Sequence, residues 1–197
     1  MMHRTGRRMV SAVREASRQM PYPLPGAFFL TDPQRTPDPV SVVNTLPNGT
    51  GVIYRHFGAA DRNEVAKALR AATYRKGIAL LVANDPDLAI AVKADGVHWP
   101  EARAHLARKW QGRFLIQTQS AHSRRAIANA VCDAVLVSTA FPSNSASAGA
   151  SMGPVKFRRL VMGTEKTVYA LGGVNAETAG RVSKFAGLAA IEGFTCT

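Results

Sequence analysis

Cysteine is scarce in this sequence, which has only Cys132 and Cys196 among its 197 residues. Their spacing does not match a metal-binding motif, and two cysteines are too few for the disulfide framework of a small secreted domain. We therefore expect neither kind of scaffold. A reducing cytoplasm is the simplest location for such a chain.

Long apolar runs are also missing. No stretch approaches the roughly 18 apolar residues that a membrane-spanning helix needs. The basic amino terminus lacks the long apolar core and small-residue cleavage site of a signal peptide. The sequence therefore predicts neither membrane insertion nor secretion.

Acidic residues are few, with 13 against 25 lysines and arginines, and the formal charge is +12. Clustered positive charge can bind nucleic acid through counterion release. Much of this excess, however, lies within residues 1–20, where five arginines face the single acid Glu15. Aromatic residues make up only 7% and do not alternate with basic ones as in single-strand binders. These features disfavour nucleic acid as the partner.

The rest of the sequence alternates between two kinds of segment. Short apolar runs rich in strand-forming residues alternate with longer stretches in which apolar residues return every three or four positions. The runs lie at 27–31, 52–55, 78–82, 96–98, 114–118, 134–137, 168–171 and 188–191, and helices are expected at 61–75, 87–93, 123–131 and 176–184. This pattern predicts an α/β fold, a single (β/α)8 TIM barrel, with an open doubly wound sheet as the alternative.

A proline-rich segment divides the chain. Residues 1–25 form a basic amino-terminal arm that ends in Pro-Tyr-Pro-Leu-Pro, where the prolines prevent a continuous helix. Residues 26–197 form the predicted barrel domain. Thr197 follows the eighth run closely, so we expect the final helix of the barrel to be truncated and the arm to cover the exposed barrel face instead.

Polar residues gather where the predicted strands end, which is where barrel enzymes place their active sites. They are Thr31, Asp32, Arg55, His56, Asn84, Asp85, His98, Ser120, His122, Gly172 and Gly173. Each has an ordinary structural alternative. Asn84 and Asp85 can cap a helix, and His98 can be an interior histidine.

Together, these residues predict a phosphate site. Gly172 and Gly173 would free backbone amides for phosphate oxygens, although they can also form a simple tight turn. Arg55 offers a fixed fork of donors, and Asp85 is suited to Mg²⁺. The long segment 138–153, rich in Ser, Ala and Gly, is expected to be a functional loop after the sixth strand.

Five segments resemble a known family. They are Phe-Leu-Thr-Asp at 29–32, Asn-Asp-Pro-Asp-Leu-Ala at 84–89, Ala-Asp-Gly-Val-His at 94–98, Ser-Ala-His-Ser at 120–123 and Ala-Leu-Gly-Gly-Val-Asn at 170–175. In order and spacing they resemble motifs of thiamine-phosphate synthases and their thiazole tautomerase relatives. The resemblance covers about residues 28–194.

The resemblance implies a transferase of thiamine biosynthesis that acts on small phosphorylated substrates. Such an enzyme joins a hydroxymethylpyrimidine diphosphate to a thiazole phosphate and releases pyrophosphate with Mg²⁺. The residues it implies are Arg55 and Asn84 for the diphosphate, Asp85 for the metal, Ser120 for the leaving pyrophosphate, and Gly172 and Gly173 for the thiazole phosphate. A homodimer is left open as the assembly.

Four positions depart from the family pattern. Phe57 and Ala146 stand where the family has lysines, and Glu192 replaces a small polar residue near the thiazole phosphate. Arg103 aligns with a second metal-binding aspartate and is expected to compensate by a direct contact. Since a charge-assisted contact to phosphate is worth about 1.5 to 3 kcal/mol, the missing lysines predict altered or reduced synthase activity.

Two other functions remain open. A thiazole phosphate tautomerase would use His122 as its general acid or base, because histidine titrates near neutral pH. A non-catalytic barrel would keep the ligand pocket without turnover. The diphosphate subsite separates these readings, since only the synthase requires it.

Overall fold

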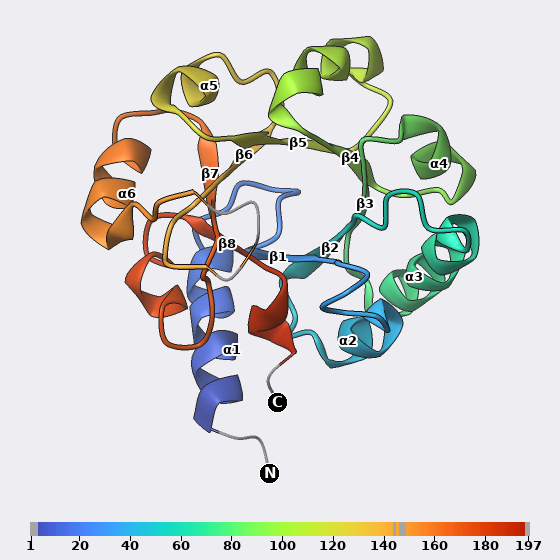
Figure 1. Cartoon of the computed structure of the whole chain (residues 1–197), viewed down its shortest axis with the longest axis horizontal. Helices are drawn as coiled ribbons and strands as arrows, with labels where there is room; N and C mark the ends of the chain where they lie inside the picture. The colour runs from blue at the N-terminus through green and yellow to red at the C-terminus, as the bar shows by residue number, and fades with distance from the viewer. Residues whose placement is uncertain (1–3, 144, 146–148, 196–197) are drawn as a thin grey trace.

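The computed structural model describes residues 4–143, 145 and 149–195. Eight parallel strands form a closed barrel in chain order. They are β1 (Ala27–Leu30), β2 (Thr50–Tyr54), β3 (Leu80–Ala83), β4 (Gly96–Trp99), β5 (Ile116–Ala121), β6 (Ala134–Val137), β7 (Thr167–Leu171) and β8 (Gly187–Ala190). Pairing of β8 with β1 closes the ring (Figure 1). The predicted TIM barrel is therefore confirmed, and the open sheet is excluded.

Helices surround the barrel (Figure 1). The α-helices are α1 (Arg4–Ser17), α2 (Pro39–Thr45), α3 (Arg62–Lys76), α4 (Pro86–Ala91), α5 (Arg124–Ala128) and α6 (Gly153–Val161); the 3-10 helices are η1 (Glu101–Trp110), η2 (Ala179–Arg181) and η3 (Glu192–Phe194). Three of the four expected helices are present as α3, α4 and a shorter α5. No helix in the described part of the chain is long and apolar enough to cross a membrane.

The prediction of a helix at 176–184 is wrong, because the chain there forms turns on either side of the short η2. The Thr178 hydroxyl accepts a hydrogen bond from the Asn175 amide and donates one to the Gly173 carbonyl. Such local side-chain bonds compete with a regular helix. Periodicity alone therefore overestimated the helix after β7.

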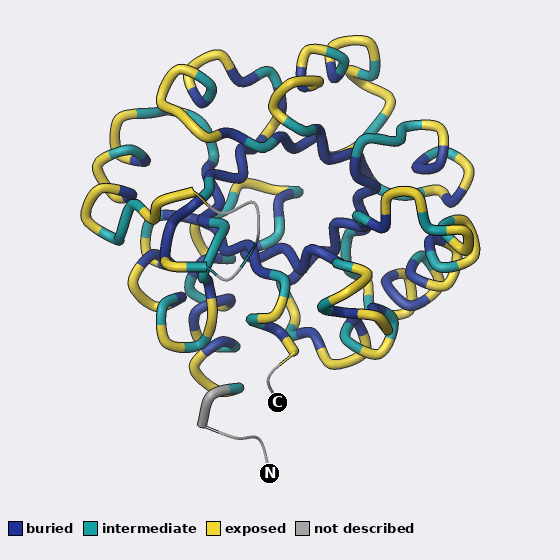
Figure 2. Tube along the Cα trace, in the orientation of Figure 1, coloured by how far each residue is buried: buried dark blue, intermediate teal, exposed yellow. Residues whose placement is uncertain are grey.

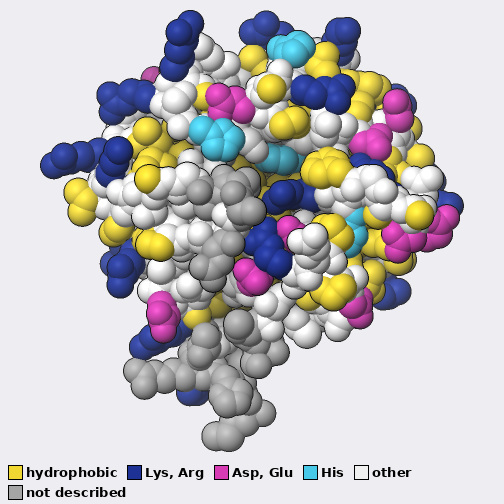
Figure 3. Space-filling model, viewed as in Figure 1, with side chains coloured by type: hydrophobic (Ala, Val, Ile, Leu, Met, Phe, Trp, Pro, Cys, Tyr) yellow, Lys and Arg dark blue, Asp and Glu magenta, His cyan; other side chains and the backbone are white. Residues whose placement is uncertain are grey.

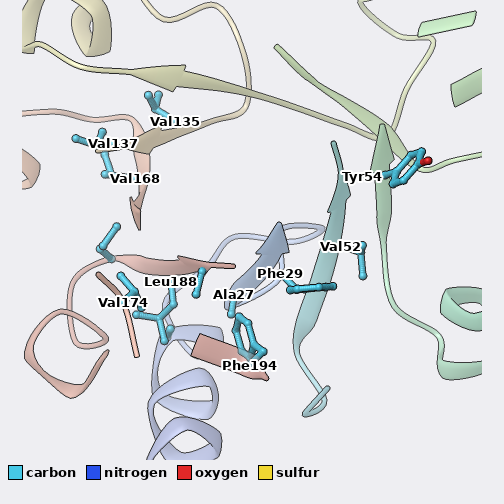
Figure 4. Close-up of a cluster of buried hydrophobic side chains, with 14 of the residues drawn as sticks. Ala27, Phe29, Val52, Tyr54, Val135, Val137, Val168, Val174, Leu188 and Phe194 are labelled. Carbon is cyan, nitrogen blue, oxygen red and sulfur yellow. The ribbon is translucent and has the colours of Figure 1, made fainter. Parts of the chain in front are cut away.

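Strand alternation sorts the core into two layers. Ala27, Phe29 and Val52 face the helices, in the cluster that Figure 4 shows. The intervening residues Phe28 and Ile53 fill the barrel interior. Because both faces are buried, the strands are nearly continuous apolar runs, and they form the dark ring in Figure 2.

The amino end of the barrel is filled. Leu24, just before β1, belongs to the interior cluster. The Tyr169 hydroxyl donates to the Pro25 carbonyl. Gly187 makes room for this ring, since a Cβ there would lie 2.3 Å from Tyr169 Cδ1. The filled interior at this end leaves the opposite, carboxyl end for a ligand.

Helix α1 packs against the outside of β8 and β1 and against η2. Its buried residues recur at helical spacing and are Met9, Ala12, Val13 and Ala16. Met9 lies near Gly193 at the carboxyl end of the barrel, whereas Ser17 lies beside Gly26 at the amino end. The helix thus has the place and direction that a helix after β8 takes in a regular barrel, while after β8 the described chain forms only η3.

Candidate active site

A cavity of about 610 Å³ opens at the carboxyl ends of the strands. Each strand contributes a lining residue from its last two positions or directly after its end: Leu30, Arg55, Ala83, His98, Ser120, Ser138, Leu171 and Ala190. Figure 3 shows a hollow at the centre of this face, where basic, acidic and histidine side chains meet. The ends of all eight strands therefore line one cavity.

The inward direction of the polar lining follows from strand alternation. Ile53 fills the interior, so Arg55 two residues later also points inward. On β5 the same register leads from Ile116 to Ser120. The same alternation that builds the core thus places two predicted site residues in the lining of the cavity.

His98 connects to two hydroxyls on β5. Its Nδ1 lies 2.9 Å from Thr118 Oγ1, and its Nε2 lies 3.1 Å from Ser120 Oγ. Burial, with a further contribution from the charge of Arg55, lowers the pKa of His98 to about 3. The imidazole is therefore neutral, with one donor and one acceptor nitrogen, and it orients the Ser120 hydroxyl.

Two arginines line the cavity, in the segments that follow the neighbouring strands β1 and β2. Arg55 follows β2, and its amide donates to Thr31 Oγ1 over 2.9 Å. Burial lowers the pKa of the Arg55 guanidinium, which still stays charged at neutral pH because its ordinary pKa is so high. Arg35, in the loop after β1, lies 2.8 Å from Asp32 and 3.7 Å from Glu192. Sequence analysis missed Arg35, and the only signal for it was the Asp-x-x-Arg spacing.

Glu192 accordingly has a basic neighbour. It lies in η3 after β8 and lines the cavity together with Arg35. Burial acts to raise the pKa of Asp32, but hydrogen bonds and charge from Arg35 outweigh it, and the net pKa is lowered. The Arg35 guanidinium thus lies close to both carboxylates and offsets their negative charge.

Gly172 and Gly173 also line the cavity, directly after β7. Both adopt positive φ, 92° and 63°, which side chains disfavour. A Cβ at Gly173 would lie 2.2 Å from the Pro142 carbonyl oxygen. The glycine pair therefore lets the loop after β6 pack close to β7, and Ser143 and Ser145 of that loop line the cavity. The described part of 138–152 has no helix or strand, as expected; Ala146 lies outside the described residues.

Asn84 and Asp85 do not line the cavity. Ala83 is the inward residue at the end of β3, and Asn84 follows with a φ of 55°. This turn carries Asp85 to the start of α4, where Oδ1 accepts from the Leu88 amide over 3.0 Å and Oδ2 lies 3.3 Å from Arg62 Nη2. The capping alternative describes this geometry, and the ligand roles of both residues stay predictions.

His122 lies at the rim of the cavity with 61% of its side chain exposed. Its Nδ1 and its backbone nitrogen both lie 2.8 Å from Glu101 Oε2. A histidine paired with a carboxylate is held in a fixed orientation and can exchange protons with a ligand.

Two other residues that depart from the family pattern, Phe57 and Arg103, lie in different places relative to the cavity. Phe57 lines the cavity mouth with 56% exposure, beneath the Arg62 guanidinium. Arg103 is exposed on η1 and is not among the lining residues. The described lining contains two arginines, no lysine and two acids, Glu177 and Glu192. The cavity thus has less positive charge than the family pattern supplies.

The donors for a metal are equally sparse. Within residues 4–143, 145 and 149–195, no three His, Cys, Asp or Glu side chains group as a metal site. Both oxygens of Asp85 are engaged, one by α4 and one by Arg62. As they stand, these residues do not fit a Mg²⁺ ion held by Asp85.

Comparison with known proteins points in one direction. The thiamine-phosphate synthase of Prochlorococcus marinus is 30% identical over 152 residues, which are 73% of this chain and 44% of that protein. A putative thiamine-phosphate synthase of Geobacter sulfurreducens is 34% identical over 119 residues, covering 56% of this chain and 55% of that protein. The chain thus matches about half the length of these curated relatives.

Solved structures share the fold. Thiamine phosphate pyrophosphorylase from Pyrococcus furiosus superposes with a TM-score of 0.68 at 24% identity, over 84% of this chain and 85% of that one. The citrate synthase SbnG matches with a TM-score of 0.56 at 13% identity, over 84% of each chain. The family model described as thiamine monophosphate synthase matches residues 27–194, from the first residue of β1 to the last of η3. The chain is therefore a member of the thiamine monophosphate synthase family.

Proposed function

We propose that this chain joins a pyrimidine methyl diphosphate to a thiazole phosphate and releases pyrophosphate. The observation that carries the proposal is one cavity lined by Arg55 after β2, Ser120 on β5 and the glycine pair after β7, within the residues that match the family. Side-chain donors and backbone amides in the same cavity suit two phosphorylated ligands held side by side.

The proposed chemistry needs charge neutralisation rather than a general base. As the diphosphate leaves, negative charge grows on its oxygens, and preorganised donors stabilise that charge. Arg55 supplies a half-buried cation, and Ser120 supplies a hydroxyl whose direction is fixed by neutral His98. Gly173 would offer its backbone to the thiazole phosphate.

Mg²⁺ stays a separate part of the proposal, and no step is assigned to it. For Asp85 to bind a metal, its contact with Arg62 has to be released. Assays with added Mg²⁺ and with EDTA test whether the reaction depends on the ion. A cytoplasmic location and a homodimer also remain predictions from sequence, which cell fractionation and light scattering check.

The deciding experiment is an assay of the purified protein with both substrates, measuring thiamine phosphate and pyrophosphate. Arg55→Gln should lower kcat/KM by about ten- to a hundredfold, since it removes a charge-assisted contact. Arg18→Gln, at an exposed position beyond α1, is the matched control and should leave the rate unchanged. Wild-type protein that forms no product from both substrates would refute the proposal.

The His122 and Glu101 pair favours one second candidate, a thiazole phosphate tautomerase. His122→Asn should abolish tautomerisation but spare coupling, because the coupling step needs no general base. Loss of coupling together with tautomerisation would instead assign His122 to the proposed synthase site. A non-catalytic barrel predicts ligand binding with neither activity.

A further inference from the structure

Arg35 lies between two carboxylates, those of Asp32 and Glu192, and its contact with Asp32 is the tighter one. Its Nη2 donates to Asp32 Oδ2 over 2.8 Å. Asp32 is itself fixed, because its Oδ1 accepts from the amides of Gln34 and Arg35, each over 3.1 Å. The guanidinium is therefore anchored from the loop after β1.

The contact on the other side is loose. Arg35 Nη1 lies 3.7 Å from Glu192 Oε2, which is too long for a hydrogen bond. The Glu192 side chain is 55% exposed, against 19% for Asp32. Exposed ion pairs of this kind contribute little stability, because water screens them. Glu192 can thus be displaced from Arg35 at small cost, whereas Asp32 cannot.

A ligand phosphate is a stronger partner for the free edge of Arg35 than this carboxylate. It has more negative charge and more acceptor oxygens, and guanidinium matches its geometry. Arg35 and Arg55 both line the cavity, and their charges act on each other. An anion between two cations relieves their repulsion.

We propose that Arg35 is an anion-binding residue of this cavity, and that Glu192 acts as an internal competitor that a ligand phosphate displaces. This inference rests on the proposed function only in taking a phosphorylated ligand to be bound here. It also gives Glu192, which departs from the family pattern, a defined effect on specificity. Glu192 lowers affinity for phosphate, and Arg35 restores part of it.

The test is calorimetric titration of the full-length protein with inorganic pyrophosphate and, separately, with inorganic phosphate. Glu192→Gln should tighten anion binding about two- to fivefold, the range of a screened ion pair. Arg35→Gln should weaken it about tenfold or more. In the double variant Glu192→Gln should no longer help, because the two residues act through one interaction. A larger effect on pyrophosphate than on phosphate assigns Arg35 to a diphosphate group, and equal effects assign it to a monophosphate.

Glu177→Gln is the matched control. It removes the same charge from the same cavity, and within the described residues Glu177 has no ion pair. Equal tightening by Glu177→Gln and Glu192→Gln would overturn the inference in favour of a general field effect. So would tightening by Glu192→Gln that persists without Arg35. Since Glu192 is exposed, its variant tests the inference even if Arg35→Gln fails to fold.

The result is separable from the proposed function. No turnover is measured, so anion binding can follow the expected pattern in a protein that makes no thiamine phosphate. That outcome would support the inference and reject the synthase. A protein that turns over both substrates, yet binds pyrophosphate equally well with and without Arg35, would do the reverse.

Discussion

At the scale of single residues, the clearest constraint is on Gly173, which combines positive φ with a close approach to Pro142. Gly173→Ala should lower the free energy of unfolding by more than the roughly 1–2 kcal/mol that a left-handed conformation costs an L-residue, because the loop after β6 must also move. Urea unfolding measures the change. Gly180→Ala, with no atom within 4 Å of the added Cβ, should be nearly neutral, and equal effects at both sites would contradict this account.

His98 makes stability depend on pH. Its folded pKa of about 3 lies below its ordinary value of 6.5, so the unfolded chain binds more protons between these values. Protonation of His98 in the unfolded chain therefore has no effect on the free energy of unfolding above about pH 6.5. Below that pH it lowers the free energy of unfolding by at most about 1.4 kcal/mol per pH unit. Unfolding at pH 7.0, 6.0 and 5.0 should show this slope in wild type and a shallower one in His98→Asn. Parallel slopes in the two proteins would show that His98 is not the group responsible.

At the scale of elements, α4 offers a way to separate structure from ligand binding at Asp85. Asp85→Ala should lower the free energy of unfolding by about 1–2 kcal/mol, through the lost cap and the lost ion pair. Asp85→Asn keeps a good cap and should stay closer to wild type. Activity that survives in Asp85→Asn would exclude a required metal ligand, whereas lost activity in a stable protein would support one.

The strands were predictable because their apolar runs are buried on both faces. Their carboxyl ends then placed Arg55, Ser120 and the glycine pair correctly at one cavity. What the sequence could not show is where a chain turns after leaving a strand. The left-handed turn at Asn84 removes its neighbour Asp85 from the lining, although both directly follow β3.

Contacts between distant segments were equally hidden. Arg35 and Glu192 meet only because β8 pairs with β1, so no local spacing could bring them together. The helix expected after β7 failed for a local reason, since Thr178 and Asn175 bond to each other and to the backbone. Hydrophobic periodicity records which face is buried, but it does not record such competing hydrogen bonds.

At the scale of the whole molecule, α1 contributes to the outer layer of the barrel. Deleting residues 1–20 removes α1 and exposes the surface of β8, β1 and η2 that it covers. The lost burial should lower the free energy of unfolding by on the order of 3–5 kcal/mol. Thermal melts should therefore fall well below wild type, with a smaller change in pyrophosphate affinity. Changing Arg7, Arg8, Arg14 and Arg18 to Gln, all exposed, is the control and should preserve stability. An unchanged melting temperature after deletion, with loss of nucleic-acid binding, would instead favour the nucleic-acid partner that composition disfavours.

The filled amino end of the barrel also bears on the order of events. With Leu24 and Tyr169 filling that end, the cavity formed by the described residues opens at the carboxyl face. For two substrates that share it, the one seated deeper must enter first, and its product must leave after the other has cleared the way. This order of entry and release gives ordered rather than random kinetics. In product-inhibition experiments, only the last product to leave should compete with the first substrate to bind.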